Sequence, residues 1–388
     1  MKGLRAIIEQ EIRDRGPIPF SRYMELCLYH PELGYYSRNA DQFGKAGDFY
    51  TSSDIHAVFG RLLARQFEEM WRMLGSPATV TLKELGPGRG LFARDVLDWS
   101  EKKFPDFFRA LRYVLSERSP ALRQKIEQNL RTHIESGKAV IEEASAVKAG
   151  SINADIGTSE LVPFPIVHFA NELFDAVPVE IVSSEGSLRI DARGGHFLET
   201  WVPASAEELE FLDRYSIHPE PGERVEVPVP SMRQTAAAIQ MAQGFAIIID
   251  YGYTREEQLA GRHRGTLKAI RQHSVSANPY EAPGEQDITA DVNFTALASF
   301  IEKDRGLQPQ KLITQSQFLM GVGEANQFAD AFEDCRSPQE RTKVALQLKH
   351  LVTPAGMGES FHVLVASNGI EEAKVRRLSG LSFGRRQD

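Results

Sequence analysis

Hydrophobic positions follow two different periods along this chain, and their alternation predicts an α/β fold. Short, nearly continuous apolar runs are typical of buried strands, and the segments between them carry apolar residues at helical spacing. Such strands, separated by helices, indicate a mostly parallel sheet that is covered on both faces. The predicted strands lie at 79–82, 111–115, 139–141, 166–170 and 245–249, with a returning strand at 361–366.

The first part of the chain, 1–77, is predicted to be a mostly helical N-terminal region. A loop rich in glycine, aspartate and serine interrupts it at 44–54. After that loop, apolar residues recur at helical spacing from Val58 to Leu74. One face of this segment is therefore expected to pack against the core.

Two insertions interrupt the predicted core, which comprises 78–182 and 244–388. The first insertion, 183–243, has short alternating segments and a Gly194-Gly195 turn, which predict antiparallel strands in a small α+β subdomain or lid. A second, late insertion covers 251–355 and precedes the returning strand.

Composition limits the classes of function. The 388 residues are 42% hydrophobic, enough for a sizeable core. The net charge of -8 argues against a nucleic-acid partner, which requires a basic surface. Cys27 and Cys335 lack the spacing of a metal site or disulfide framework, so we expect no metal and a reducing compartment. With no long apolar run and a helical pattern from Leu4 onward, the chain is predicted to be cytoplasmic, without membrane insertion.

The clearest chemical signal is a glycine turn between a predicted strand and a predicted helix. Glycines at 86, 88 and 90 allow positive φ angles and let a ligand approach the backbone. Glu84 precedes them, and an acidic residue before alternating glycines indicates S-adenosylmethionine (SAM). A dinucleotide motif would need its third glycine at position 91, where Leu91 stands. We therefore predict that Glu84, Gly86, Gly88 and Gly90 bind SAM, the alternative being a turn without a ligand.

Polar residues follow the second and third predicted strands, where an open parallel sheet binds its ligands. Glu117 is expected to accept hydrogen bonds from the two ribose hydroxyls. Glu143 is expected to contact the adenine amino group. For both residues, an ordinary surface carboxylate is the alternative.

The fourth and fifth predicted strands end in further polar groups. Asn171, Glu172 and Asp175 follow the fourth strand, where a methyltransferase presents the methyl group to its acceptor. Asn171 is assigned to the cofactor, and Glu172 and Asp175 to catalysis. Asp250 follows the fifth strand and is a further catalytic candidate. Capping of the next helix is the competing explanation for the group after the fourth strand.

Five motifs in order resemble the MidA-type family of SAM-dependent methyltransferases, which includes the mitochondrial complex I assembly factor that acts on protein arginine. The resemblance implies a class I methyltransferase fold, which is Rossmann-like. For mitochondrial members it implies symmetric dimethylation of an arginine in a complex I core subunit. The family often has histidine where this chain has Asp291. The motifs lie at 47–51, 84–90, 170–179, 249–252 and 284–292.

The resemblance also directs attention to residues that spacing alone would not select. Asp48 and Thr51 lie on an N-terminal loop that is expected to fold over the cofactor. Gln286 and Asp287 lie on a loop that is expected to close the acceptor side and bind substrate. Turn formation is the alternative role for these residues.

Arginine as an acceptor sets a specific chemical requirement. SAM brings its own leaving group, so the protein has to align the acceptor nitrogen and exclude water. A guanidinium is protonated and delocalised, and carboxylates must orient it before it reacts. We predict that Glu172 has this role, with Asp175 or Asp250 second.

The predicted function is protein arginine N-methylation of a respiratory complex I (NADH dehydrogenase) subunit or a related protein. The expected partner is therefore a protein substrate, and a homo-oligomer is compatible with the sequence. Two alternatives remain open at this point. One is a SAM-binding assembly or chaperone factor with little catalysis, and the other is a small-molecule methyltransferase.

Overall fold

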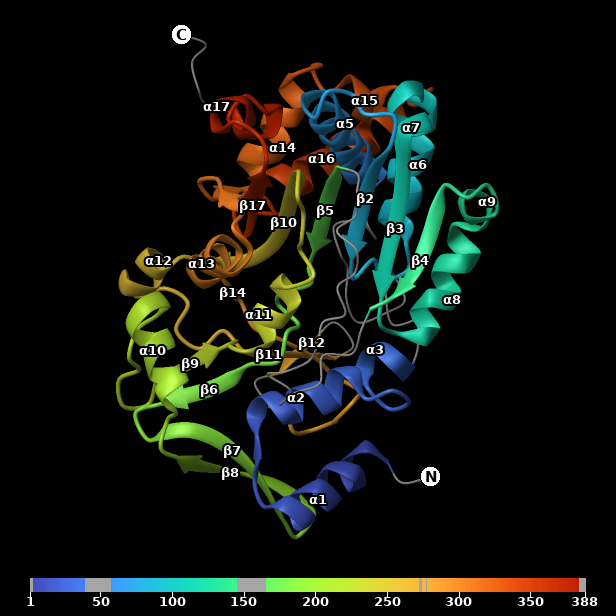
Figure 1. Ribbon diagram of the computed structural model, residues 1–388. Helices are drawn as coiled ribbons and strands as arrows, with labels where there is room; N and C mark the ends of the chain where they lie inside the picture. Colours follow the sequence, from blue (N-terminus) through green and yellow to red (C-terminus); the bar gives the residue numbers. More distant parts are fainter. Residues whose placement is uncertain (1–2, 39–56, 145–164, 272–273, 277, 384–388) are drawn as a thin grey trace.

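The structure is a computed structural model that describes residues 3–38, 57–144, 165–271, 274–276 and 278–383. A large central sheet with helices on both faces forms one part of the molecule (Figure 1). A second, antiparallel sheet lies beyond the ends toward which the central strands point, together with the first two helices (Figure 1).

The central sheet confirms the predicted α/β fold with mostly parallel strands. Its main path within the described residues has the order β15-β17-β10-β5-β2-β3-β4. Strands β10, β5, β2, β3 and β4 pair in parallel, and β17 runs antiparallel to β10. Short strands β14 and β16 pair with β10 and β17. The bounds are β2 Val80–Leu85, β3 Leu111–Glu117, β4 Ala139–Glu143, β5 Ile166–Asn171, β10 Gly244–Tyr253, β14 Val292–Asn293, β15 Gln308–Pro309, β16 Ile313–Thr314 and β17 Phe361–Asn368.

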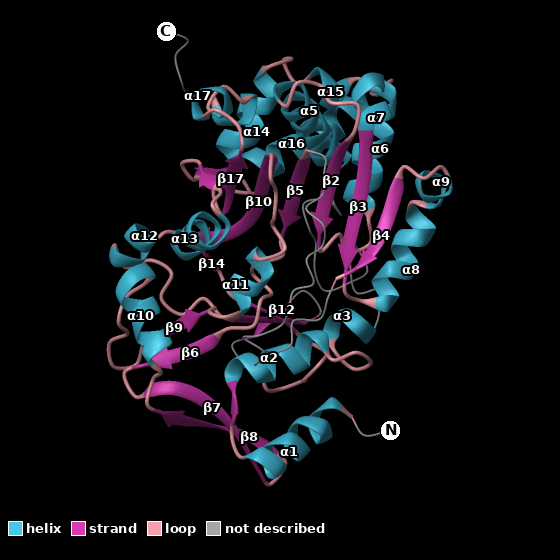
Figure 2. Cartoon of the chain, in the orientation of Figure 1, coloured by secondary structure: helices cyan, strands magenta, loops and turns pink. Residues whose placement is uncertain are grey.

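Helices cover both faces of this sheet because its central strands are apolar on both sides (Figure 2). In β10, Phe245, Ile247 and Ile249 belong to one buried cluster, and the alternating Ala246 and Ile248 belong to another. The first face packs against α5 Ala57–Met73, α6 Leu91–Lys103, α14 Gln315–Glu324 and α16 Pro338–Val352. The second packs against α10 Ala206–Tyr215, α11 Ser231–Ala236 and α13 Phe294–Arg305.

The other helices from Tyr35 onward in the described part of the chain differ in length. They are α3 Tyr35–Arg38, α7 Pro105–Ala110, α8 Pro120–Asn129, α9 Arg131–Glu135, α12 Arg255–Leu259, α15 Ala329–Phe332, α17 Glu372–Val375 and the 3-10 helix η2 Ser379–Leu381.

The predicted antiparallel strands at the first insertion are present. Strand β6 Glu180–Ser183 leads into the insertion and pairs with β7 Gly186–Arg193 and β9 Arg224–Val227, and β8 His196–Val202 pairs with β7. Gly194 and Gly195 connect β7 to β8 with φ angles of +59° and +79°, as a tight hairpin turn requires. A two-residue strand, β1 Ile18–Pro19, pairs with β7 and brings the N-terminal region into this sheet. Two residues are too short for a periodic signal, so the sequence did not predict β1.

The described helices of the N-terminal region pack in two places. Helices α1 Leu4–Arg15 and α2 Phe20–Tyr29 bury their apolar faces against the antiparallel sheet, whereas α5 packs on the central sheet. Ile288 of β13 joins the α1–α2 cluster. Strand β13 belongs to a small sheet with β11 and β12, in the late insertion. Its bounds are β11 Lys268–Arg271, β12 Ser274–Ser276 and β13 Asp287–Thr289.

Replacing Phe169 with alanine tests the packing of the central sheet. Phe169 is fully buried, its ring stacks on Phe92 at 4.4 Å, and it lies edge-on to Phe67 at 5.6 Å. Removing such a ring should cost about 3–5 kcal/mol of unfolding free energy, measured by urea denaturation. Leu346→Ala on α16 is the control, because Leu346 is 63% exposed and should change stability by no more than about 0.5 kcal/mol. Equal losses for the two variants would contradict the described packing.

Candidate functional site

The glycine turn follows β2 and has the geometry of a ligand-binding turn. Gly86, Gly88 and Gly90 have φ angles of +66°, +54° and +73°, in the region that favours glycine. A Cβ atom at Gly86 would lie 2.8 Å from Cδ1 of Leu173, and one at Gly90 would lie 3.0 Å from Cδ1 of Leu130. At Gly88 no atom of a described residue lies within 4 Å of that position. A ligand can therefore approach the backbone at Gly88.

Glu84 lies at the end of β2 and faces the neighbouring strand. Its side chain is buried, and the Tyr113 hydroxyl donates a hydrogen bond of 2.7 Å to Oε2. Burial raises the pKa of Glu84 to about 8, with a smaller contribution from the negative charge of Glu117. The hydrogen bond from Tyr113 opposes this shift.

Glu117 at the end of β3 is joined to the glycine turn. The backbone N–H of Ser119 donates to its Oε1 at 2.8 Å, and the backbone N–H groups of Gly88 and Arg118 also favour its charged form. Burial outweighs these contacts and raises the pKa of Glu117 to about 7. A carboxylate therefore lies beside the turn, where the sequence predicted a partner for ribose hydroxyls.

The other residues assigned to the cofactor differ in their surroundings. Glu143 at the end of β4 has a side chain that is 75% exposed and lies 3.5 Å from Arg123. Asn171 ends β5, and its Oδ1 is buried without a hydrogen-bond partner in the described part of the chain. Asp48 and Thr51 lie outside the described residues, so the structure does not place them.

Glu172 begins a tight turn after β5. Its φ angle is +51°, a left-handed conformation that costs a residue with a Cβ atom roughly 1 kcal/mol or more. Its N–H donates to the carbonyl of Ile249 at 2.9 Å, and Asn171 Nδ2 donates to its Oε1 at 3.0 Å. Leu173 then packs against Gly86. The turn thus places Glu172 beside the glycine turn, in a backbone conformation that the surrounding structure must hold.

Asp250 lies beneath this turn and is completely buried. Its Oδ2 accepts hydrogen bonds from the N–H groups of Leu173, Phe174 and Asp175 at 3.1, 2.8 and 3.2 Å. Its Oδ1 accepts one from the N–H of Tyr251 at 2.9 Å. Burial raises the pKa of Asp250, and the nearby carboxylates, Asp175 first, raise it further. Both oxygens bind backbone amides, and Oδ2 has the geometry of an anchor for the turn.

Asp175 ends the hydrogen-bonded part of the turn and is also buried. The Tyr251 hydroxyl donates to its Oδ2. Its backbone carbonyl accepts from the N–H of Ala290 at 2.9 Å, which ties the turn to the late insertion. Burial raises the pKa of Asp175 to about 6.

The two residues predicted to bind substrate face different surroundings. The Gln286 side chain is buried within its own loop: Oε1 accepts from the N–H of Ala282 at 3.0 Å and Nε2 donates to the carbonyl of Asn278 at 3.2 Å. Asp287 Oδ1 accepts a hydrogen bond of 2.8 Å from the Tyr36 hydroxyl.

Tyr36 is a residue of this region that the sequence did not reveal. Besides its bond to Asp287, its carbonyl accepts from the Ser119 hydroxyl at 2.8 Å. It therefore links the end of β3 to the start of β13. Helix α3 has four residues, too few for a periodic signal that could have identified it.

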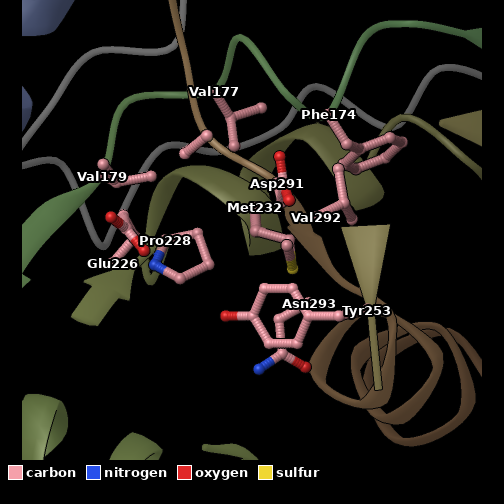
Figure 3. A pocket seen from close by; sticks show the side chains of 11 residues that line it. Phe174, Val177, Val179, Glu226, Pro228, Met232, Tyr253, Asp291, Val292 and Asn293 are labelled. Carbon is pink, nitrogen blue, oxygen red and sulfur yellow. The ribbon is translucent and has the colours of Figure 1, made fainter. Parts of the chain in front are cut away.

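A small cavity lies next to the turn, between β9 and the 290–293 segment (Figure 3). Its volume is about 10 Å³, enough for about one water molecule. It is too small for a cofactor. Asp291 borders the cavity and accepts from Lys268 Nζ and His263 Nδ1, each at 3.0 Å. The lining residues are Phe174, Val177, Val179, Glu226, Pro228, Met232, Tyr253, Ala290, Asp291, Val292 and Asn293.

Three further observations concern metals, thiols and membranes. Within the described ranges, no group of three or more His, Cys, Asp or Glu side chains is arranged to hold a metal ion. Cys27 and Cys335 are free thiols. Among the helices of the described residues, none has the length and apolar character needed to span a membrane.

Comparisons with known proteins agree with this geometry. A family model described as "Putative S-adenosyl-L-methionine-dependent methyltransferase" matches residues 62–313. The chain is 30% identical to the mitochondrial protein arginine methyltransferase NDUFAF7 homolog of Drosophila melanogaster, over 98% of this chain and 88% of that protein. It is 27% identical to the Homo sapiens protein arginine methyltransferase NDUFAF7, mitochondrial, over 91% of this chain and 80% of that protein.

Two solved structures from Burkholderia thailandensis have the same fold. One, determined with S-adenosyl-homocysteine (SAH) bound, has a TM-score of 0.81 and 28% identity, covering 99% of this chain and 95% of that one. The other, a native structure, has a TM-score of 0.76 and 27% identity, covering 98% of this chain and 94% of that one.

The raised pKa of Glu84 predicts how stability depends on pH. Its usual pKa is 4.5 and burial raises it to about 8, so between these values the folded chain holds a proton that the unfolded chain has lost. This contribution to stability is present below about pH 4.5 and disappears as the pH rises to about 8. Glu84→Gln, whose amide oxygen can still accept from Tyr113, should flatten this dependence in ligand-free protein.

Urea denaturation at several pH values between 4.5 and 8 measures the effect. Glu127→Gln serves as the control, because Glu127 is exposed on α8 and its replacement should leave the slope of stability against pH unchanged. Parallel slopes for wild type and Glu84→Gln would show that Glu84 is not the group responsible.

Proposed function

The chain belongs to this family of SAM-dependent methyltransferases, and we propose that it methylates arginine side chains of a protein. It is an enzyme of the methyltransferase class, with SAM as its cofactor. The observation that carries the proposal is Glu172, held in a left-handed backbone conformation beside the glycine turn. The printed names of the relatives support arginine as the acceptor.

The described residues at the carboxyl ends of the central strands fit SAM. Gly88 leaves space at the backbone, and Glu117 presents a buried carboxylate to the same turn. Asn171 adds a buried amide oxygen that has no partner among the described residues. When bound, SAM supplies the methyl group and the sulfonium leaving group. In our proposal Gly86, Gly88 and Gly90 shape the binding turn, Glu117 accepts the ribose hydroxyls, and Asn171 contacts the cofactor.

Glu172 is proposed to orient the acceptor. A guanidinium presents its N–H groups in a planar fork, which a carboxylate can bind through two hydrogen bonds. Such paired bonds fix the position of the guanidinium. They also draw its positive charge onto the nitrogens that donate the bonds and away from the nitrogen that accepts the methyl group. Asp250 is proposed as a positioning residue, because its Oδ2 holds the turn from beneath.

The insertions are proposed to form the wall of the acceptor site. The carbonyl of Asp175 binds Ala290 of the late insertion, and the carbonyl of Ala176 accepts from the Tyr29 hydroxyl at 2.9 Å. Helix α2, which carries Tyr29, packs in one cluster with the antiparallel sheet of the first insertion. A protein segment bound at the turn would therefore lie against both insertions.

The narrower part of the proposal is an acceptor arginine in a respiratory complex I subunit, and it rests on the five-motif resemblance. A cytoplasmic site of action does not rest on that resemblance and stays a separate prediction. The relatives named above are described as mitochondrial, and their names support a protein substrate. The experiment that tests the function is incubation of the enzyme with labelled SAM and a lysate from cells lacking it, followed by mass spectrometry of labelled proteins. A labelled lysine or metabolite, with arginine untouched, would refute the acceptor assignment.

Replacing Gly88 with valine should abolish SAM binding. The side chain would occupy the open space in front of the backbone, and φ is +54° at this position. Gly137→Val is a matched control, because Gly137 has φ of +72° and equally open surroundings but lies before β4, away from the turn. Calorimetry should show loss of SAM binding in the first variant only. If Gly88→Val kept its affinity for SAM, the glycine turn would not be part of the SAM-binding site.

Replacing Glu172 with glutamine should stop turnover and leave SAM affinity unchanged. The amide keeps the shape of the side chain but cannot bind a guanidinium as a carboxylate does, so we expect a loss of about a hundredfold or more in kcat. Asp250→Asn is the comparison: it sets an NH2 group against backbone N–H groups and should lower both turnover and thermal stability. A Glu172→Gln enzyme that turns over normally, or that no longer binds SAM, would contradict the assignment.

A further inference from the structure

The turn after β5, residues 172–175, is called the acceptor turn below. Asp175 at its end forms a buried pair with Tyr251, and the role proposed for Glu172 does not explain this pair. Asp175 is 3% exposed, and the Tyr251 hydroxyl donates to its Oδ2. The other oxygen, Oδ1, is buried and makes no hydrogen bond of standard geometry among the described residues, while the nearby backbone N–H groups of Asp175 and Ala176 favour the ionised carboxylate. A buried carboxylate oxygen without a partner is costly, so this atom is a candidate to bind a ligand.

The charges around Asp175 are mostly negative. Asp250 lies on the same strand as Tyr251, and Glu172 lies on the same turn as Asp175. The negative charge of Asp291 raises the pKa of Asp175, and the charges of Asp175 and Glu172 raise the pKa of Asp250. From the N-terminal helices, the phenol groups of Tyr29 and Tyr36 face Asp175, and they also face Asp287 of β13.

The Lys268 ammonium lies close to Tyr251 but is already bound elsewhere. Lys268 Nζ lies 5.3 Å from the centre of the Tyr251 ring, but it pairs with Asp291 Oδ1 at 3.0 Å. No ion pair joins Asp175 to a basic side chain in the described part of the protein. A positive charge supplied by a ligand would therefore complete this cluster.

We propose that Asp175 and Tyr251 form a subsite for the cationic acceptor side chain, with Asp175 Oδ1 as the ligand and Tyr251 as the residue that positions it. The inference rests on the proposed function and deepens it. Tyr251 binds Oδ2 and so prevents the carboxylate from rotating, which leaves a single directed acceptor. Glu172, three residues earlier on the turn, offers a second carboxylate. A forked guanidinium can donate to two separate carboxylates at once. A neutral isostere would leave the negative charge of Asp175 without a compensating positive charge.

The subsite should respond to pH in a way that a purely structural pair would not. Burial raises the pKa of Asp175 to about 6, and the hydrogen bond from Tyr251 opposes that shift. Cation binding needs the ionised carboxylate, so affinity should rise with pH through about 6. Removing the Tyr251 hydroxyl removes a donor that favours the ionised form. The midpoint should then move to a higher pH.

Calorimetry on the full-length protein saturated with SAH tests the subsite between pH 5 and 8. The probes are N-acetyl-arginine methylamide and its neutral counterpart, N-acetyl-citrulline methylamide. Wild type should bind the arginine probe at least about tenfold more tightly, and Asp175→Asn should remove most of this preference. Tyr251→Phe should shift the pH midpoint upward by about one unit. SAH affinity should stay within about twofold of wild type in both variants, because neither residue belongs to the glycine turn.

Two variants control for the substitutions themselves. Asp106→Asn replaces a side chain that is 74% exposed, and Tyr215→Phe removes a hydroxyl that hydrogen-bonds the hydroxyl of Ser299 on α13. Both should keep the preference for the arginine probe and its pH midpoint. If Asp175→Asn does not fold, the Tyr251→Phe midpoint decides the question alone.

Equal affinity of wild type for the two probes would overturn the subsite. So would a Tyr251→Phe protein that loses thermal stability while its pH midpoint stays in place. The proposed function fails separately: if labelling of lysate proteins finds an acceptor other than arginine, but the arginine probe is still preferred, the subsite holds and the arginine-methylation proposal does not.

Discussion

The carboxylate of Asp250 is the interaction on which the geometry of this site depends. It accepts hydrogen bonds from four backbone N–H groups, three of them from consecutive residues of the turn after β5. The same turn is held at its start by the pairing of β5 with β10, where the N–H of Glu172 reaches the carbonyl of Ile249. With both ends fixed, the backbone can keep Glu172 at φ of +51°, which an isolated chain would avoid.

This arrangement concentrates negative charge at low exposure. Asp175, Asp250 and Asp287 are each nearly inaccessible to solvent, and Glu172 is close enough to Asp250 to raise its pKa. Burying several carboxylates together is unfavourable unless protons, hydrogen bonds or cations compensate them. Here backbone amides compensate Asp250, and tyrosine hydroxyls compensate part of Asp175 and Asp287. The remaining imbalance favours a positively charged ligand, in agreement with a guanidinium acceptor.

The antiparallel sheet and the N-terminal helices contribute to the site through a few tyrosines. Tyr36 connects Ser119, near the glycine turn, with Asp287 on the acceptor side. Tyr29 binds the carbonyl of Ala176 and lies 5.0 Å beneath the guanidinium of Arg118. Because α2 packs on the antiparallel sheet, direct contacts run from that sheet through Tyr29 to the turn after β5. The first insertion is therefore connected to the site by packing and a hydrogen bond.

The sequence predicted the central strands and the glycine turn because both have local signals: apolar runs, and glycines where φ must be positive. It also placed Glu117 and Glu172 at strand ends, since parallel strands end at one edge of a sheet. It could not distinguish the role of Asp250 from that of Glu172, because both are acidic residues that follow apolar strands. Their difference lies in hydrogen bonds between residues 75 to 77 positions apart, which no local pattern encodes. Only the folded backbone shows that the Asp250 carboxylate binds the amides of the turn from beneath. These hydrogen bonds maintain the strained backbone conformation of Glu172, the residue that carries the other carboxylate.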